Sequence, residues 1–115
     1  AESPAAFQSW MAQQRAPAVA STDSANAVGI DAFRRAGCAI CHSIQGTDAR
    51  GRIGPDLTHL ASRSRIAAGT LRNTRGNLAG WISNSQALKA GNDMPSMTLT
   101  SLELRTLLAY LETLK

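Results

Sequence analysis

This sequence lacks any long hydrophobic run and has few aromatic residues. Its longest apolar block covers residues 107–111, far short of the roughly 18 apolar residues that a membrane-spanning helix needs, so we expect a water-soluble chain. An initiating methionine and a signal peptide are missing too, which indicates a processed product or an excised fragment. Aromatic residues make up 4% of the 115 positions, and a single small domain often needs a large buried group to complete its core.

Basic residues do not gather into runs. The twelve lysines and arginines contribute to a formal net charge of +4, but no run is longer than Arg34-Arg35. Nucleic-acid-binding domains concentrate positive charge on one face, so we expect no nucleic-acid partner. Docking to a charged protein explains the charge equally well, and Arg50, Arg52 and Lys89 lie in predicted loops that could carry such a contact.

Two segments precede the predicted domain. Residues 1–15 are predicted to form a short helical arm, in which Ser3 caps the helix and Pro4 occupies its first position. The large apolar residues of the arm have helical spacing and share one face: Phe7, Trp10 and Met11. Residues 16–28 are small and polar without periodicity, which indicates a linker. The domain proper is therefore expected to cover 29–115.

The predicted domain is all-α with long loops. Helices are expected at 29–37, at 77–84 and from 100 onward, with short helical turns at 57–62 and 66–70 and a loop over 83–99. The last helix is the clearest, because Thr100 and Glu103 form a capping box and leucines follow at helical spacing. No segment shows a sustained strand pattern.

The motif Cys38-Ala39-Ile40-Cys41-His42 is the C-x-x-C-H signature of covalent haem attachment. Each thiol adds to one vinyl group of the porphyrin, and two intervening residues let the thiols span neighbouring pyrroles. The histidine that follows is then held below the iron and becomes its proximal ligand. The motif therefore predicts one covalent haem c, which would also give the long loops something to pack against.

Three other uses of the two cysteines remain open. A thioredoxin-like redox pair is expected in a βαβ context, which the sequence does not show. A disulfide between Cys38 and Cys41 would close a very small loop. A zinc site could recruit both thiols with His42 and His59, although adjacent Cys41 and His42 are poorly placed to bind one tetrahedral ion. For His59, a surface or loop position is the favoured interpretation.

An electron carrier also needs a sixth iron ligand. Met94 and Met97 are the candidates, and Met94 is favoured because residues 91–93 before it and Pro95 after it shape a tight loop. A thioether is a soft, neutral ligand, so a His/Met pair raises the reduction potential. Both methionines could instead merely pack, and an open iron would then indicate gas sensing or peroxidase-like chemistry.

Further residues are expected around the haem. The Pro55 carbonyl is a candidate acceptor for the His42 Nδ1 proton, which would orient the ring, with an ordinary turn proline as the alternative. Trp81 is expected to pack near the haem. Three residues are candidate donors of hydrogen bonds to the haem propionates: Arg63, Arg72 and Asn73. The forked guanidinium group of arginine suits carboxylates. For Arg72, a solvated surface position is the alternative.

Together these residues resemble the class I cytochrome c family over about 29–115. The matching positions are Gly29, Phe33, Cys38, Cys41, His42, residues 54–57, Arg63, Leu78, Trp81, residues 91–94, Tyr110 and Leu111. The resemblance implies a small fold of three to five helices and long loops wrapped around one covalent haem. It also implies that Gly29 and Phe33 pack against Tyr110 where the first and last helices cross, and that Met94 is the axial ligand.

A closer resemblance is to the cytochrome c domain of subunit II of caa3-type cytochrome c oxidases. It rests on residues 54–63, 66–69 and 73–82, and on the arm, which is similar to the end of the cupredoxin domain of that subunit. It implies that the domain passes electrons from a respiratory donor protein to the CuA centre at the periplasmic face of the bacterial inner membrane. The domain alone would then be an electron carrier and not an enzyme.

The sequence also departs from these families. Ser85 and Ala90 stand where the family commonly has proline, so the methionine loop is expected to be less stiff. The CuA ligands and the transmembrane helices of subunit II are absent from this sequence, so any membrane contact would come through the parent complex. A free periplasmic monohaem cytochrome c, acting as a diffusible shuttle, is the alternative, and it would not need the Phe7/Trp10 face.

Overall fold

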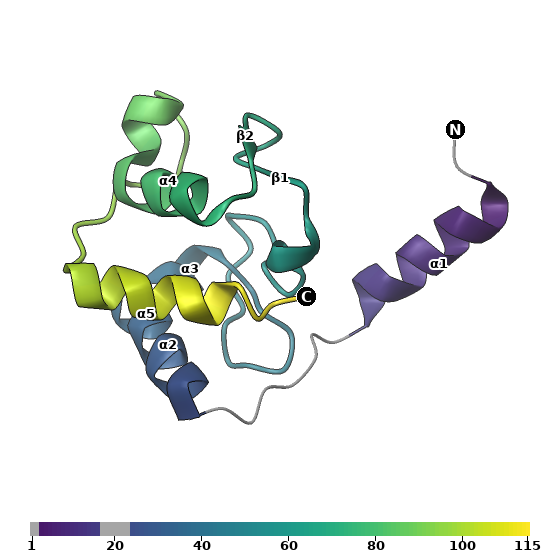
Figure 1. Cartoon of the computed structure of the whole chain (residues 1–115), viewed down its shortest axis with the longest axis horizontal. Helices are drawn as coiled ribbons and strands as arrows, with labels where there is room; N and C mark the ends of the chain where they lie inside the picture. The colour runs from purple at the N-terminus through teal and green to yellow at the C-terminus, as the bar shows by residue number, and fades with distance from the viewer. Residues whose placement is uncertain (1–2, 17–23) are drawn as a thin grey trace.

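The computed structural model describes residues 3–16 and 24–115, and it is mostly helical. Its elements are α1 (Pro4–Arg15), α2 (Ser24–Arg35), α3 (Cys38–Cys41), the 3₁₀ turn η1 (Leu60–Ser62), β1 (Arg65–Ile66), β2 (Leu71–Arg72), α4 (Arg75–Leu88) and α5 (Ser101–Leu111). Figure 1 shows α2 to α5 gathered around irregular loops, with α1 set apart. Within the described stretches, no helix is both long and apolar enough to cross a membrane.

The arm forms the helix that its sequence predicted. Ser3 caps α1, because its side chain accepts a hydrogen bond from the Ala6 amide at 3.1 Å. Phe7 and Trp10 stack with ring centroids 6.0 Å apart and are 47% and 50% exposed. None of the residues of α1 is buried, so the aromatic face of the arm stays open to solvent.

Helix α2 begins at Ser24, so the predicted linker over 16–28 is wrong for residues 24–28. This stretch contains Ala25 and Ala27, and alanine is the strongest helix former even though it also suits a small-residue spacer. Residues 17–23 of the predicted linker lie outside the described residues. The helix ends at Arg35, two residues earlier than predicted.

The crossing of α2 and α5 forms the centre of the core. A Cβ atom built on Gly29 would lie 2.3 Å from the Tyr110 Cβ atom and 3.1 Å from the Thr106 carbonyl oxygen, so only glycine allows this approach. The rings of Phe33 and Tyr110 meet edge to face at 6.4 Å. Helix α5 begins with the predicted capping box of Thr100 and Glu103. Its leucines at 107, 108 and 111 are buried.

Helix α4 is longer than the predicted helix over 77–84. Thr74 caps it, accepting a hydrogen bond from the Asn77 amide at 3.1 Å. Asn84 has non-helical angles (φ −147°, ψ 44°), which kink the helix before it continues to Leu88. The predicted loop over 83–99 therefore begins only after Leu88, because the helix resumes beyond the point where its apolar periodicity stops.

Two short strands replace the helical turn predicted over 66–70. Ile66 of β1 pairs with Leu71 of β2 in antiparallel register. Ala67 and Ala68 in the connecting turn have φ values of 53° and 54°, the left-handed region that β-carbons disfavour. Strands of two residues are too short to show a period of two, which explains why the sequence did not reveal them.

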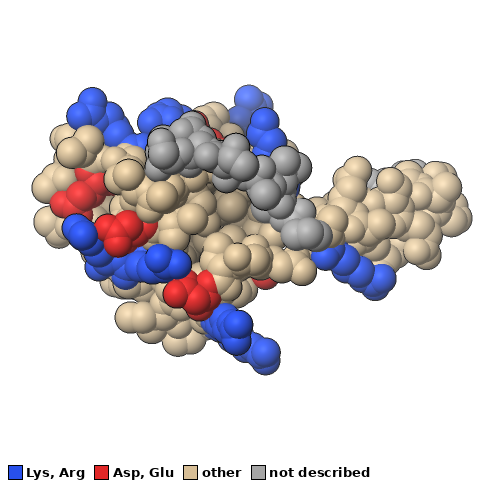
Figure 2. All heavy atoms as spheres, turned by 90° about the horizontal axis from the view of Figure 1, so that it is seen from below, with Lys and Arg blue, Asp and Glu red and all other residues tan. Residues whose placement is uncertain are grey.

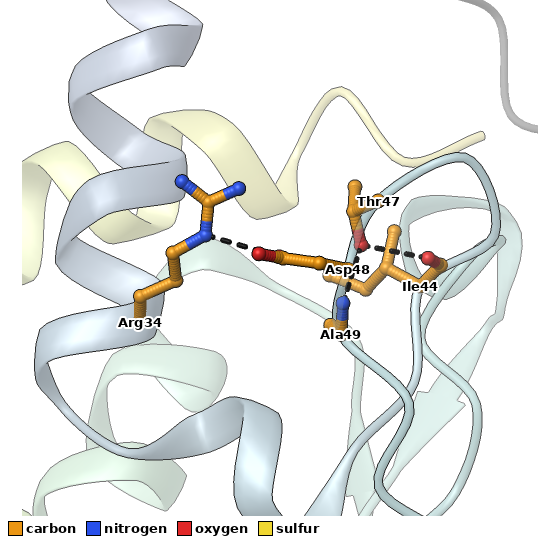
Figure 3. A network of polar contacts seen from close by, with 5 residues as sticks. All are labelled: Arg34, Ile44, Thr47, Asp48 and Ala49. Atoms are coloured by element: carbon orange, nitrogen blue, oxygen red, sulfur yellow. Dashed lines mark hydrogen bonds and ion pairs between the residues drawn. The ribbon is translucent and has the colours of Figure 1, made fainter.

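The loop after α3 is tied to α2 (Figure 3). Arg34 Nε lies 3.1 Å from Asp48 Oδ1. Within the loop, Thr47 Oγ1 donates to the Ile44 carbonyl at 2.8 Å and accepts from the Ala49 amide at 3.1 Å. The exposed ion pair adds little stability, so the internal hydrogen bonds do most to fix the loop that follows His42.

Charged residues of both signs share the surface. On the face shown in Figure 2, acidic side chains lie among the lysines and arginines, and no continuous basic patch covers the visible part. Two further exposed pairs, Arg35–Asp31 and Arg75–Glu112, lie at 2.9 Å and 2.8 Å. Basic side chains on this face are therefore interrupted by acidic ones.

We expect Gly29→Ala to lower the free energy of unfolding by about 1–3 kcal/mol, because the new methyl group forces α2 away from α5. Gly80→Ala is the matched control, since a Cβ atom there would meet only Leu88 Cδ1 at 3.9 Å. It should raise stability by roughly 0.5–1 kcal/mol through helix propensity. Denaturant unfolding of the haem-loaded proteins measures both changes, and equal effects of the two substitutions would contradict the tight crossing.

Candidate haem-binding site

A cavity of about 860 Å³ opens between α3, the following loops, α4 and α5. Its walls are largely apolar and include Phe33, Leu57, Leu78, Leu107 and Leu111. The cavity also brings together most of the site residues predicted from the sequence: Cys38, Cys41, His42, Pro55, Arg63, Trp81 and Met94. Residues more than fifty positions apart therefore contribute to one site.

The two cysteines begin and end one turn of helix. Gly37 precedes α3 in a left-handed conformation (φ 79°), and both thiols are free and partly exposed toward the cavity. Burial raises the pKa of the Cys38 thiol, whereas a reactive redox thiol needs a lowered pKa. Both thiols lie at the cavity, as attachment of one porphyrin at Cys38 and Cys41 requires.

His42 is oriented by a backbone carbonyl. Its Nδ1 lies 2.8 Å from the Pro55 oxygen, the contact that the sequence predicted. A carbonyl oxygen can only accept, so Nδ1 carries the proton and Nε2 is left with a free lone pair. This tautomer makes Nε2 available to a metal within the cavity.

Two glycines let the chain approach His42 closely. A Cβ atom on Gly54 would lie 2.5 Å from His42 Cε1, and one on Gly51 would lie 2.5 Å from the Cys41 carbonyl carbon. The amides of both glycines donate to this segment, Gly54 to the Cys41 carbonyl at 2.7 Å and Gly51 to the His42 carbonyl at 3.2 Å. Gly51 was not singled out from the sequence, because an isolated glycine in a loop gives no signal of what it faces.

Asp56 holds the turn that presents Pro55. Its Oδ1 accepts from the Thr58 amide at 2.8 Å, and its Oδ2 accepts from the Ser43 hydroxyl at 3.1 Å. Arg63 Nη2 donates to the Asp56 carbonyl at 2.8 Å. Burial opposes ionisation of Asp56, but the hydrogen bonds from Thr58 and Ser43 and the charge of Arg63 outweigh it, so its pKa is lowered.

The predicted propionate donors have different positions. Arg63 lines the cavity, whereas Asn73 does not, and a contact of either side chain with a propionate stays a prediction. The Asn73 side-chain amide donates to the carbonyls of Leu60 and Arg63, both at 2.9 Å, and thereby ties β2 to η1. Arg72 is exposed and also lies outside the lining. Arg65 also lines the cavity. The sequence did not reveal this position, because the two-residue strand that carries Arg65 is too short to show a pattern.

Met94 and Met97 both lie in the loop between α4 and α5 and both line the cavity. The Met94 amide donates to Asn92 Oδ1 at 2.7 Å, and the Met97 amide donates to the Ile82 carbonyl at 3.0 Å. The loop was expected to be less stiff because Ser85 replaces a proline. In the structure the Ser85 hydroxyl donates to the Met94 carbonyl at 2.7 Å, which restrains the loop in another way.

His59 lies in a loop as expected, but it is only 9% exposed. Its Nε2 contacts the Ala16 carbonyl at the end of the arm, and it is not part of the cavity lining. Over residues 3–16 and 24–115, no three His, Cys, Asp or Glu side chains form a group that could hold a metal ion. The zinc alternative therefore has no support.

The cavity suits a covalent haem by the chemistry of its donors. Cys38 and Cys41 could form two thioethers, His42 Nε2 could bind the iron from one side, and a methionine thioether could bind it from another element. The volume lies within the range of cofactor pockets, and apolar walls with a few polar groups match a porphyrin with two carboxylates.

Comparisons with known proteins agree with this site. A family model described as Cytochrome c matches residues 27–115. Cytochrome c oxidase subunit 2 of Alkalihalophilus pseudofirmus is 32% identical over 110 residues, which cover 95% of this chain and 31% of that protein. The protein of the same name from Bacillus subtilis is 28% identical over 115 residues, covering 95% and 32%. The chain thus spans about one third of the length of these relatives.

A solved structure shares the fold. The c-type cytochrome SorU from Sinorhizobium meliloti superposes with a TM-score of 0.55 at 23% identity, covering 78% of this chain and 90% of that one. At this identity the likeness shows the fold alone. The arrangement of α2 to α5 is therefore a cytochrome c fold, as the sequence resemblance implied.

We expect Asp56 to contribute to stability in a pH-dependent way. Because its pKa is lowered on folding, its contribution is present above the unfolded pKa near 4 and is lost as the pH falls through the lower folded value. Asp56→Asn should remove this part of the acid sensitivity. Denaturant unfolding between about pH 6 and about pH 3 measures it. If the free energy of unfolding depends on pH equally in wild type and in Asp56→Asn, Asp56 has no such role in stability.

Proposed function

Because the chain belongs to the cytochrome c family, we propose that it is the haem-bearing electron-transfer domain of subunit II of a caa3-type cytochrome c oxidase. A cytochrome c domain transfers electrons and is not an enzyme by itself. In the proposed role this domain receives electrons from a respiratory donor protein and passes them to the CuA centre of the same subunit. Because c-type haem is attached outside the cytoplasm, we place the domain at the periplasmic face.

The observation that carries the haem assignment is the His42–Pro55 contact beside the two free thiols. Cys38 and Cys41 would hold the haem covalently, and His42 Nε2 would bind its iron because Nδ1 is engaged at 2.8 Å. Met94 is the proposed sixth ligand. When bound, the haem supplies a one-electron iron couple, and histidine with methionine places its potential high.

Similarity to the oxidase subunits extends beyond the cytochrome domain. The relatives align with 95% of the chain, a share that residues 27–115 alone cannot supply. The alignments therefore reach into the arm. The exposed Phe7–Trp10 stack of α1 is the feature that a preceding domain would cover, which supports the proposal that the arm is the end of a cupredoxin domain.

Exposed apolar residues at the cavity margin support a protein partner. Ile40 and Ile53 line the cavity and are 74% and 69% exposed. Arg52 is exposed next to Ile53, and Lys89 also lines the cavity. Exposed apolar side chains and positive charges at the margin of one cavity suit brief docking of a partner with an acidic rim.

Loss of the Met94 thioether should be visible in the spectrum. Ferric wild-type protein should show the weak red charge-transfer band of methionine-ligated haem. Met94→Ala should abolish the band and lower the reduction potential by on the order of 0.1 V, within the range that axial ligands span. Met97→Leu is the control, and it should keep the band and the wild-type reduction potential. A band that survives Met94→Ala but disappears in Met97→Leu would transfer the ligand role to Met97.

The complete gene product tests the parent complex. We expect it to contain a dinuclear copper centre and one haem c, and electrons supplied to the haem should reach the copper at a rate independent of protein concentration. Rapid mixing with a reductant, followed at haem and copper wavelengths, measures this rate. A copper-free product whose haem exchanges electrons only in bimolecular encounters would instead be the diffusible shuttle.

A further inference from the structure

The loop that carries Met94 is fastened to the end of α4 by partly buried and exposed hydrogen bonds. We propose that Ser85 and Gln86 are positioning residues that hold the Met94 backbone so that its sulfur stays at the iron. This inference rests on the proposed ligation by His42 and Met94. It assigns a function to two side chains that do not themselves touch the metal.

The kink at Asn84 interrupts α4 just before Ser85. Ser85 follows the kink and is completely buried. Its hydroxyl donates to the Met94 carbonyl at 2.7 Å, and Gln86 Nε2 donates to the same oxygen at 2.8 Å. A carbonyl oxygen has two lone pairs, so these two donors use its full accepting capacity.

Asn92 extends the same network to the amide of Met94. Its Oδ1 accepts from the Met94 amide at 2.7 Å, while its Nδ2 donates to the Ser85 carbonyl at 3.2 Å and to the Lys89 carbonyl at 2.6 Å. Gln86 Nε2 also donates to the Asn92 carbonyl at 2.8 Å. Both polar backbone groups of Met94 are thus fixed, directly or through one residue, to the segment that begins at Ser85.

This restraint matters because a methionine ligand is weak and flexible. The side chain has three rotatable bonds, and a neutral thioether gains little from charge. Ligation therefore depends on how much freedom the loop has already lost before the sulfur binds, which is the general benefit of preorganisation. A loop released from Ser85 would populate open conformations more often and leave the iron to other ligands.

The competing explanation is purely structural. The Asn92 side chain satisfies the Ser85 and Lys89 carbonyls at the end of α4, and the whole network could do no more than stabilise the fold. A structural role alone would change the resistance to denaturant without changing ligand exchange at the iron. The test therefore measures both quantities on the same proteins.

The variants are Ser85→Ala and Gln86→Leu, with Ser83→Ala as the matched control on an exposed part of the same helix. Imidazole is titrated into the ferric, haem-loaded protein, and its binding rate is followed by stopped flow. Imidazole must displace Met94, so Ser85→Ala should bind it about five- to tenfold more tightly and faster, the effect of one lost, partly buried hydrogen bond. Gln86→Leu should shift imidazole binding in the same direction by about two- to fivefold, because its bonds to the Met94 and Asn92 carbonyls are exposed to solvent. Ser83→Ala should behave as wild type.

The double variant Ser85→Ala/Gln86→Leu should exceed either single variant, because the Met94 carbonyl then loses both donors. Met94→Ala sets the upper limit of imidazole affinity. Gln86 is exposed, so Gln86→Leu keeps the inference testable if Ser85→Ala does not fold. Circular dichroism and denaturant unfolding report the folding of each variant.

The outcomes separate this inference from the proposed function. A wild-type protein without the red methionine band would show that Met94 is not the ligand, and the proposed function would fail first. If wild type has the band and both single variants bind imidazole as wild type does, the positioning role of Ser85 and Gln86 is wrong. Lower resistance to denaturant with unchanged imidazole binding would show the structural role alone.

Discussion

The hydrogen bond between His42 Nδ1 and the Pro55 carbonyl, at 2.8 Å, fixes the ring nitrogen that faces the cavity, and several parts of the chain keep it in place. Gly54 lets the backbone lie against the imidazole ring. Asp56 closes the turn through Thr58 and Ser43. Without this support the imidazole could rotate or change tautomer. A haem attached at the two neighbouring thiols would then meet no oriented imidazole ligand for its iron.

The cavity and the core depend on each other. Phe33, Leu107 and Leu111 line the cavity on one side and belong to the α2–α5 crossing on the other. These side chains form one apolar wall of a cavity of about 860 Å³, and protein interiors are normally closely packed. A large flat apolar group attached at Cys38 and Cys41 would complete the packing. Cofactor binding and stability are therefore expected to be linked in this domain.

The arm contacts the domain at one end and exposes its aromatic face. The contact between His59 and the Ala16 carbonyl ties the end of the arm to the loop that precedes η1. The aromatic face of α1, by contrast, has no cover among the described residues. A helix of this length is marginal in water without tertiary contacts. The relatives are about three times as long as this chain.

Local features of this protein were determined by the sequence. The C-x-x-C-H motif, the Thr100 capping box and the Ser3 cap each involve residues within four positions, and such spacings have the same geometry in any fold. Tertiary structure decided the contacts between irregular segments. It brought Gly51 to the Cys41 backbone, bound Ser85 to Met94 and bound Asn73 to the Leu60 carbonyl. Loop contacts follow no periodicity, so only the folded chain shows which distant residues meet.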